Sequence, residues 1–134
     1  MPARTTLATF TKLIGYIREL CQKAGKPMIS AAVMPFTSIS KDRDTALSKI
    51  SVESLIAEAN KFQTWVKPAS GKFSKLDDIR GFILAGTPAD IARESRAYEQ
   101  AGAGHIVYDL RFRYGDWLEQ IDLIGKEVLP ALRG

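Results

Sequence analysis

GTPADIARESRAYEQAGAGHIVYDLRFRYGDWLEQIDLIGKEVLPALR, residues 86–133, is the stretch that decides the fold. A helix is predicted to begin at Pro88, because the hydroxyl of Thr87 can cap it and Asp90 stands three residues after the cap, as in a capping box. The G-A-G of residues 102–104 follows the last apolar residue of this helix, where a left-handed closing residue is favoured. Residues His105–Leu110 are rich in β-formers, so a strand is predicted next.

A second helix is predicted after this strand, with Asp116 as its cap. Its apolar residues recur every one to four positions, mostly three or four, at Leu118, Ile121, Ile124, Val128, Leu129 and Leu132. The stretch therefore predicts a helix, a strand and a helix, which is the alternation of βα-type units.

The same stretch resembles the C-terminal end of the bacterial luciferase-like monooxygenase family. The resemblance rests on the order and spacing of Gly86-Thr87-Pro88, Tyr98–Gly102, His105–Val107, Glu127–Pro130 and Leu132-Arg133. It implies a (β/α)8 barrel that uses reduced flavin, such as FMN, or the deazaflavin F420. It also implies that only the last part of such a barrel is present, without the earlier segments that hold most of the flavin in the family.

The first part of the chain predicts a helix from Thr6 to Ala24, which Gly25 and Pro27 end. Its apolar stripe consists of Leu7, Phe10, Leu13, Ile14, Ile17, Leu20 and Cys21. Cys21 is the only cysteine, so no intrachain disulfide can form. Its place on the stripe indicates a buried structural thiol rather than a reactive one.

Residues Met28–Met34, M-I-S-A-A-V-M, carry no charge and predict a short strand that is covered on both faces. Pro35 is expected to close this strand, and Phe36–Ser40 to form the loop that leaves it. Asp42 or Asp44 can cap the helix that follows.

This helix is expected to break into two pieces at Ser51. Residues Phe62–Lys75 mix aromatic residues with proline, glycine and lysine and predict a loop. Packing of these aromatic residues against the core is favoured over stacking on nucleic acid, because no RNA-binding signature accompanies them. The 19 basic and 15 acidic residues of the chain are interspersed, which indicates a solvated mixed surface. Asp77–Leu84 is predicted to lead into Gly86 as a short helical turn.

The chain has 134 residues, so we expect a single domain, 1–134, and a complete (β/α)8 barrel would take roughly 250 residues. A content of 46% hydrophobic and 25% charged residues indicates neither disorder nor a membrane class. No apolar run is long enough to span a bilayer, and no apolar leader segment follows Arg4. We therefore expect a cytoplasmic protein without a membrane or nucleic-acid partner.

These elements predict an α/β protein: a partial (β/α) barrel whose βα units resemble the C-terminal part of a TIM barrel. Two strands cannot close a barrel, and a two-stranded parallel sheet leaves open edges. We therefore expect the sheet to be completed by oligomerisation, most simply as a homodimer, or by a second chain that supplies the missing half.

Sequence motifs of catalysis are absent from the chain. It holds no glycine-rich phosphate loop and no nucleophile elbow. The single histidine, His105, has no ligand partner at metal-binding spacing, so no metal site is expected. We interpret His105 as a packed or capping residue rather than a catalytic base.

Position along the strands is what singles out candidate site residues, because active sites of (β/α) barrels lie at the carboxyl ends of the strands. Arg111 and Arg113 are candidates for binding an anionic group of a cofactor, since arginine offers a matching fork of donors. Asp109 and Thr37 are candidates for contacting a substrate. Strand alternation would place Asp109, Arg111 and Arg113 on one side. The plainer alternative is an Asp–Arg pair that ties down a loop.

Three functions are compatible with these observations. In the first, the chain is a component of a luciferase-like flavin- or F420-dependent monooxygenase or oxidoreductase, and it is active only when a second polypeptide or self-association completes it. Alternatively, it is a truncated, non-catalytic scaffold or interaction protein without a cofactor. The third possibility is binding of a small anion by residues 109–113. FMN or F420 is the implied cofactor, and the chain by itself is expected to hold neither.

Overall fold

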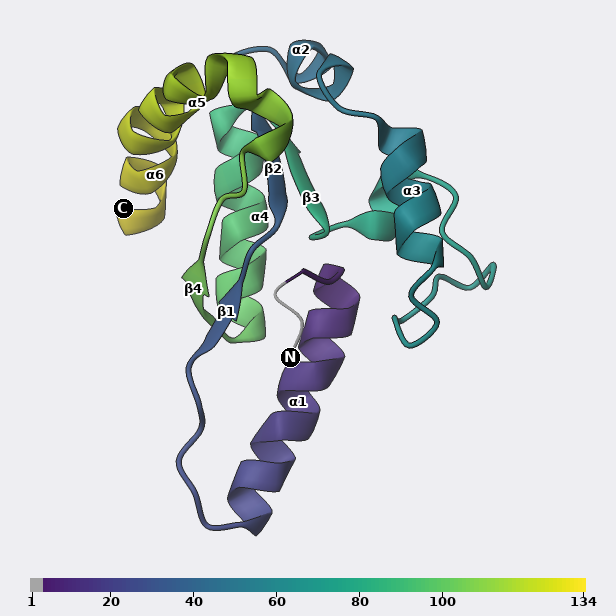
Figure 1. Ribbon diagram of the computed structural model, residues 1–134. Coiled ribbons are helices and arrows are strands. Elements are labelled where there is room, and N and C mark those ends of the chain that lie inside the picture. Colours follow the sequence, from purple (N-terminus) through teal and green to yellow (C-terminus); the bar gives the residue numbers. More distant parts are fainter. Residues whose placement is uncertain (1–3) are drawn as a thin grey trace.

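The computed structural model describes residues 4–134, which fold into helices packed around short parallel strands (Figure 1). In chain order the elements are α1 Leu7–Lys23, β1 Ala31–Val33, β2 Phe36–Ile39, α2 Arg43–Ser48, α3 Val52–Asn60, β3 Ile83–Gly86, α4 Pro88–Ala101, β4 Ala103–Ile106, α5 Trp117–Leu123 and α6 Leu129–Arg133. Short 3-10 turns span Leu76–Ile79 and Arg111–Asp116, and a π-helical turn, Ile124–Val128, joins α5 to α6.

The strands form two parallel pairs, β1 with β4 and β2 with β3. The amide of Phe36 donates to the carbonyl of Phe82 (3.2 Å), whereas the next amide, that of Thr37, donates to the carbonyl of Asp109 (2.8 Å). Successive amides of a strand point in opposite directions, so β3 and β4 lie on opposite sides of the segment formed by β1 and β2. That segment is therefore central, both outer edges are free, and residues 4–134 form no closed barrel.

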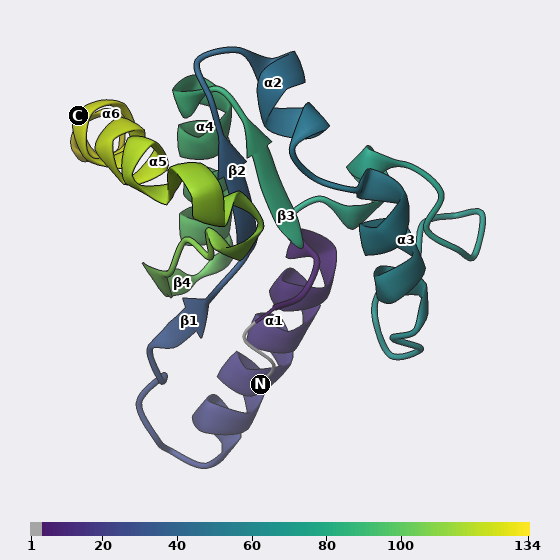
Figure 2. The same cartoon turned by 45° about the horizontal axis from the view of Figure 1, so that its top comes forward.

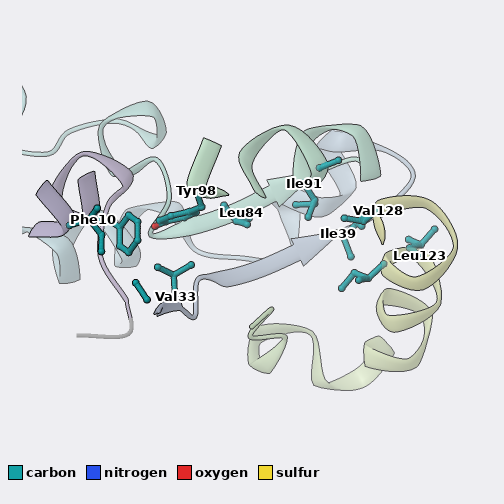
Figure 3. Packing of buried hydrophobic residues seen from close by; sticks show 12 residues of the cluster. Phe10, Val33, Ile39, Leu84, Ile91, Tyr98, Leu123 and Val128 are labelled. Atoms are coloured by element: carbon teal, nitrogen blue, oxygen red, sulfur yellow. The ribbon is translucent and has the colours of Figure 1, made fainter. Parts of the chain in front are cut away.

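One face of these strands is covered by α4 and α1, and Figures 1 and 2 show α4 behind the strands. The core on this side consists of Phe10, Ile14, Ala31, Val33, Ile39, Leu84, Ile91, Ala92, Tyr98, Leu123, Ile124 and Val128. Figure 3 shows residues of this cluster from Phe10 of α1 to Leu123 of α5 and Val128 of the π-helical turn. The buried hydroxyl of Tyr98 donates to the carbonyls of Thr5 (3.0 Å) and Gly81 (2.7 Å), which ties the start of α1 to the start of β3.

The opposite face is covered only along β3. There a second cluster contains Leu55, Ala59, Trp65, Phe73, Ile79, Phe82 and Ile83, which come from α3, from the loop after it and from the approach to β3. Beside β1 and β4 this face is open, because Ala32 and His105 are exposed and the side chain of Val107 is 48% exposed. We call this uncovered area, between Ala32 and Asp109, the open face.

Several predicted boundaries are confirmed. Helix α4 begins at Pro88 with a complete capping box between Thr87 and Asp90, and it ends at Gly102 in the left-handed region (φ 113°). Helix α1 has the predicted extent, with Thr6 as its cap. Asp42 caps α2 and Ser51 caps α3, so the predicted break is present. Residues 62–75 contain no helix or strand.

The prediction of one strand over Met28–Met34 followed by a loop is wrong. Met28 and Ile29 lie outside β1 and are exposed, and exposed Ala32 shows that β1 is not covered on both faces. Pro35 does not end the extended segment, because the chain continues as β2, Phe36–Ile39, within the Phe36–Ser40 segment predicted to be a loop. Pro35 has no amide to donate, which explains why the pairing is interrupted there and resumes at Phe36.

The third strand, β3, is missing from the prediction, which gave Asp77–Leu84 as a helical turn. The turn is present at Leu76–Ile79, but Ile83–Gly86 then pairs with β2. Ile83 and Leu84 are both buried, so this four-residue strand shows no alternation of apolar and polar residues by which to recognise it.

The C-terminal part also differs from its prediction. The strand expected over His105–Leu110 is β4, which starts at Ala103 and ends at Ile106, and only Asp109 adds a further bridge, to Phe36. Asp116 precedes α5 but its side chain does not cap the helix.

The predicted burial is wrong at four residues. Leu118 and Ile121 of α5 are exposed, Cys21 is only half-buried, and His105 is exposed rather than packed. Within residues 4–134, no helix combines the length and the apolar character that crossing a membrane requires.

Candidate anion site on the open face

Asp109 is the centre of a charged cluster at the open face. Its Oδ1 accepts a hydrogen bond from Nε of Arg111 at 3.0 Å, and its Oδ2 forms an ion pair with Nη2 of Arg111 at 2.9 Å. The backbone amide of Arg111 donates to Oδ1 as well (3.2 Å), and Arg4, which precedes α1, donates to Oδ2. The structure therefore contains the Asp–Arg pair that the sequence offered as the plainer alternative, with a second arginine added from the other end of the chain.

Burial and the two arginines act in opposite directions on the pKa of Asp109. Burial of the carboxyl is the largest single influence and would raise the pKa, but the hydrogen bonds from Arg111 and Arg4 outweigh it, so the pKa lies below its ordinary value. Asp109 is thus ionised at neutral pH and both of its oxygens are occupied. A carboxylate in this state is a poor general base and serves to position the two guanidinium groups.

Aromatic side chains surround this cluster. The guanidinium of Arg4 lies 4.5 Å from the ring centroid of Phe36, and that of Arg111 lies 5.5 Å from it. The ring of Phe112 packs against Phe36 on another side, with 4.7 Å between the ring centroids. Beside the cluster is a shallow hollow of about 370 Å³, lined by Asp109, Leu110, Arg111, Tyr114 and Trp117.

The cluster has capacity left for an anion. Two guanidinium groups and one carboxylate leave a formal charge of one positive unit, and the side chain of Arg111 is 57% exposed. The Nε of Arg4 is buried and has no hydrogen-bond partner. A phosphate or carboxylate oxygen is the natural partner for such donors.

Arg113 lies in a different place from Arg111, contrary to the prediction that alternation puts them on one side. The chain turns after Leu110, so the side chain of Arg113 is only 4% exposed and reaches the carboxyl end of β2. There its Nη1 donates to three oxygens: Oγ of Ser38 (3.0 Å), the carbonyl of Ile39 (3.1 Å) and Oγ of Ser40 (3.1 Å).

The other side of the Arg113 guanidinium faces Asp116. Nε donates to Oδ1 at 3.0 Å and Nη2 donates to Oδ2, and these hydrogen bonds from Arg113 are the main reason that the pKa of Asp116 is lowered. Gln120 completes this network, since its Oε1 accepts from the amide of Ile39 (3.2 Å) and its Nε2 donates to the carbonyl of Arg113 (3.4 Å). The carboxyl end of β2 is therefore filled by the protein's own groups.

Thr37 is separated from the open face. It is fully buried within β2, its hydroxyl donates to the carbonyl of Pro35 (3.1 Å), and its register partner Leu84 belongs to the core under α4. The structure thus brings Asp109 and Arg111 together and leaves Thr37 and Arg113 in other surroundings.

The carboxyl end of β3 is also occupied. Asp90 accepts from the amide (2.9 Å) and the hydroxyl (3.0 Å) of Thr87 and pairs with Arg93 at 2.9 Å. Gly86 has φ 149°, and a Cβ there would lie 2.4 Å from Oδ2 of Asp90, so the glycine is required for the carboxylate to reach the cap.

Sequence reasoning missed two residues of these networks. Arg4 pairs with Asp109 over 105 residues, and no local pattern signals such a contact. Gln120 does have a signal, because it lies four residues before Ile124, a member of the predicted apolar stripe. Among residues 4–134, no three His, Cys, Asp or Glu side chains are grouped to hold a metal ion.

Known proteins were compared with the chain by sequence and by structure. No protein-family model matches it, and no curated protein matches its sequence. Its fold is similar to that of the coenzyme F420-dependent tetrahydromethanopterin reductase from Methanopyrus kandleri, with a TM-score of 0.60 and 20% identity. It is also similar to an F420-dependent secondary alcohol dehydrogenase in complex with an F420-acetone adduct, with a TM-score of 0.62 and 21% identity. The likeness concerns the fold alone.

These matches cover nearly all of this chain but less than half of each solved structure. They cover 96% and 97% of this chain but only 43% and 41% of the two enzymes. The chain thus spans less than half the length of the solved structures that it resembles. This agrees, at the level of the fold, with the sequence resemblance to part of a larger barrel, and the two neighbours are F420-dependent oxidoreductases by name.

Proposed function

We propose that the chain is a component of a luciferase-like, F420-dependent oxidoreductase, and that it acts only together with further polypeptide that completes the fold. The observation that carries this proposal is the fold similarity over 96–97% of the chain to two enzymes named for F420, of which it spans 41–43%. The open face supports it as well, because a face without a cover is what a part of a larger barrel would present.

The residues of the open face offer hydrogen-bond donors to an anionic cofactor. F420 and FMN both carry phosphate, and Arg4 has a buried donor without a partner while Arg111 is exposed beside it. Arg4 and Arg111 would hold the anionic part of such a cofactor, and Asp109 would keep the two guanidinium groups in place. The bound cofactor would supply hydride transfer, which no residue of this chain provides.

A fluorescence titration with F420, and in parallel with FMN, tests the proposal on the purified chain. The sequence led us to expect no cofactor on the chain by itself, but the free donors of Arg4 and Arg111 lead us to expect a saturable change in F420 fluorescence. Arg111→Gln and Arg4→Gln should each weaken binding about tenfold by removing a charge-assisted hydrogen bond. Lys126→Gln, at an exposed cation of the π-helical turn, is the matched control and should bind as the unchanged chain does.

The alternative is a non-catalytic scaffold or interaction protein without a cofactor. A specific observation favours it: the carboxyl ends of β2 and β3, where barrel active sites lie, are filled by Arg113, Gln120 and Asp90. If neither F420 nor FMN binds at concentrations that saturate such enzymes, the oxidoreductase proposal fails for this chain by itself and the scaffold becomes the better description.

A further inference from the structure

The two free edges of the sheet differ in how they are protected. The carbonyls of Phe82 and Gly86 accept from β2, so the backbone groups of Ile83 and Ala85 face outward along the free edge of β3. This edge borders a hollow of about 330 Å³ that is also lined by charged side chains, namely Arg43, Asp77, Arg80, Arg93 and Glu94. Charged residues along an edge are a usual means of preventing further strand pairing.

The edge of β4 is less protected, because Glu99 is the one charged carboxylate or ammonium group among the residues that line the hollow beside it. The amides of Val107 and Asp109 donate inward, to the carbonyls of Val33 (2.9 Å) and Pro35 (3.1 Å), so by alternation the amides of Ile106 and Tyr108 face outward. The segment Ala103–Tyr108 contains no charged residue and no proline. An edge of this kind is a template for pairing with another strand.

The space beside this edge suits an added strand. A hollow of about 260 Å³ runs along it, and its walls include Gly104, Ile106 and Tyr108 of the edge with Leu129 and Leu132 of the C-terminal helix. The free backbone groups offer hydrogen bonds, and the two leucines offer apolar cover for the side chains of a neighbouring strand.

The segment is also complementary to itself. In an antiparallel pair centred on Ile106, Gly104 faces the partner's Tyr108, whose hydroxyl is hydrogen-bonded to Ser95 (2.8 Å) within its own copy. His105 then faces the partner's Val107, and both residues are exposed on the open face in a single copy. No like charges meet in this register, and a two-fold axis through the pair gives a closed dimer.

We infer that two copies of this chain associate through their β4 edges, as an antiparallel pair centred on Ile106 that makes one continuous sheet across the dimer. The inference goes beyond the proposed function and is argued only from the backbone and side chains of the edge. A second copy paired here would occupy one of the two edges that a completing polypeptide could use.

Light scattering and sedimentation of the purified chain at micromolar concentrations test the association. The unchanged chain should be a dimer. The double variant H105K/V107K places two like-charged pairs across the axis and should weaken self-association about tenfold or more. Both positions are exposed in the single copy, so the fold tolerates the change. Y16K/L20K adds the same charge at exposed positions of α1 and should remain dimeric.

The register is tested by reversing one of the charges. In H105E/V107K each glutamate faces the partner's lysine, so dimerisation should return to at least the level of the unchanged chain. A monomeric unchanged chain overturns the inference, as does a dimer that H105K/V107K leaves intact. If H105K/V107K and H105E/V107K dissociate equally, strand pairing in this register is refuted. F420 binding is measured separately on the same samples, so failure of one proposal is distinguishable from failure of the other.

Discussion

Replacing Arg113 by methionine should destabilise the protein far more than the same replacement of Arg111, although the two residues lie two positions apart. The side chain of Arg113 is 4% exposed and that of Arg111 is 57% exposed. Methionine keeps most of the aliphatic volume in both cases, so the comparison isolates the guanidinium group.

The magnitude follows from what each guanidinium binds. Without Arg113 the buried carbonyl of Ile39 loses a donor, which costs about 1–3 kcal/mol, and the hydroxyls of Ser38 and Ser40 lose about 0.5–1.5 kcal/mol each unless they rotate to new partners. The ion pair with Asp116 adds less than about 1 kcal/mol, since that carboxylate is 35% exposed and can be hydrated. We expect a loss of about 3 kcal/mol for Arg113→Met. For Arg111→Met we expect at most about 1 kcal/mol, as for other exposed pairs.

Urea denaturation followed by circular dichroism measures both variants under identical conditions. A loss of about 3 kcal/mol lowers the midpoint by more than 1 M at the usual slopes for a protein of this size. Equal and small shifts for the two variants would refute the reasoning, because they would mean that Arg113 is solvated and that the network at the end of β2 does not exist in solution.

Three further predictions concern the cap of α4, a glycine and acid stability. Thr87→Ala should lower the free energy of unfolding by about 1 kcal/mol, because Thr87 accepts the amide of Asp90 (3.3 Å) in the capping box; an unchanged urea midpoint would contradict this. Gly86→Ala should destabilise the protein by about 1–3 kcal/mol, because the added Cβ would contact Asp90. Gly125→Ala, in open space within a helical segment, should be neutral or stabilising. Urea denaturation that finds Gly125→Ala less stable than Gly86→Ala would contradict this geometry. Asp109 and Asp116 have lowered pKa values in the folded state, so their contribution is complete above about pH 4 and is lost as the pH falls through the folded values. The thermal unfolding midpoint should therefore decrease as the pH is lowered below about 4. The decrease should be less steep in Asp109→Asn, because asparagine does not titrate, and an equally steep decrease in both proteins would count against the cluster.

Local signals predicted the helices well because the groups that start and end them are close in sequence. Thr87 and Asp90 bond across three residues, and Gly102 closes the same helix, so the chemistry of α4 is contained in its own segment. Asp42, one of two candidate caps, and the break at Ser51 were predicted from local signals of the same kind. Each of these contacts is made whatever the rest of the chain does.

The strands could not be delimited in this way, since their extent depends on partners far away in sequence. Pro35 was expected to end a strand, but the chain stays extended because Phe36–Ile39 finds β3 about 47 residues later. Conversely, the strand expected to run to Leu110 ends at Ile106, although the amides of Val107 and Asp109 still donate to the carbonyls of Val33 and Pro35. Propensity alone carries no information about where a neighbouring strand stops.

The candidate site was predicted from the rule that active sites of (β/α) barrels lie at the carboxyl ends of the strands. The structure places the residues that this rule selected in different surroundings. The rule pointed to Asp109, Arg111 and Arg113, and it could not separate two arginines of equal chemistry. The separation comes from contacts 73–75 residues apart, which draw Arg113 into the end of β2, while Arg111 stays at the surface beside Asp109. An arginine whose donors are all used inside the protein has nothing to offer a ligand. Of the two, Arg111 is therefore the one to pair with Arg4 in any proposal for anion binding, and Arg113 is the one whose loss should be read as a change in stability.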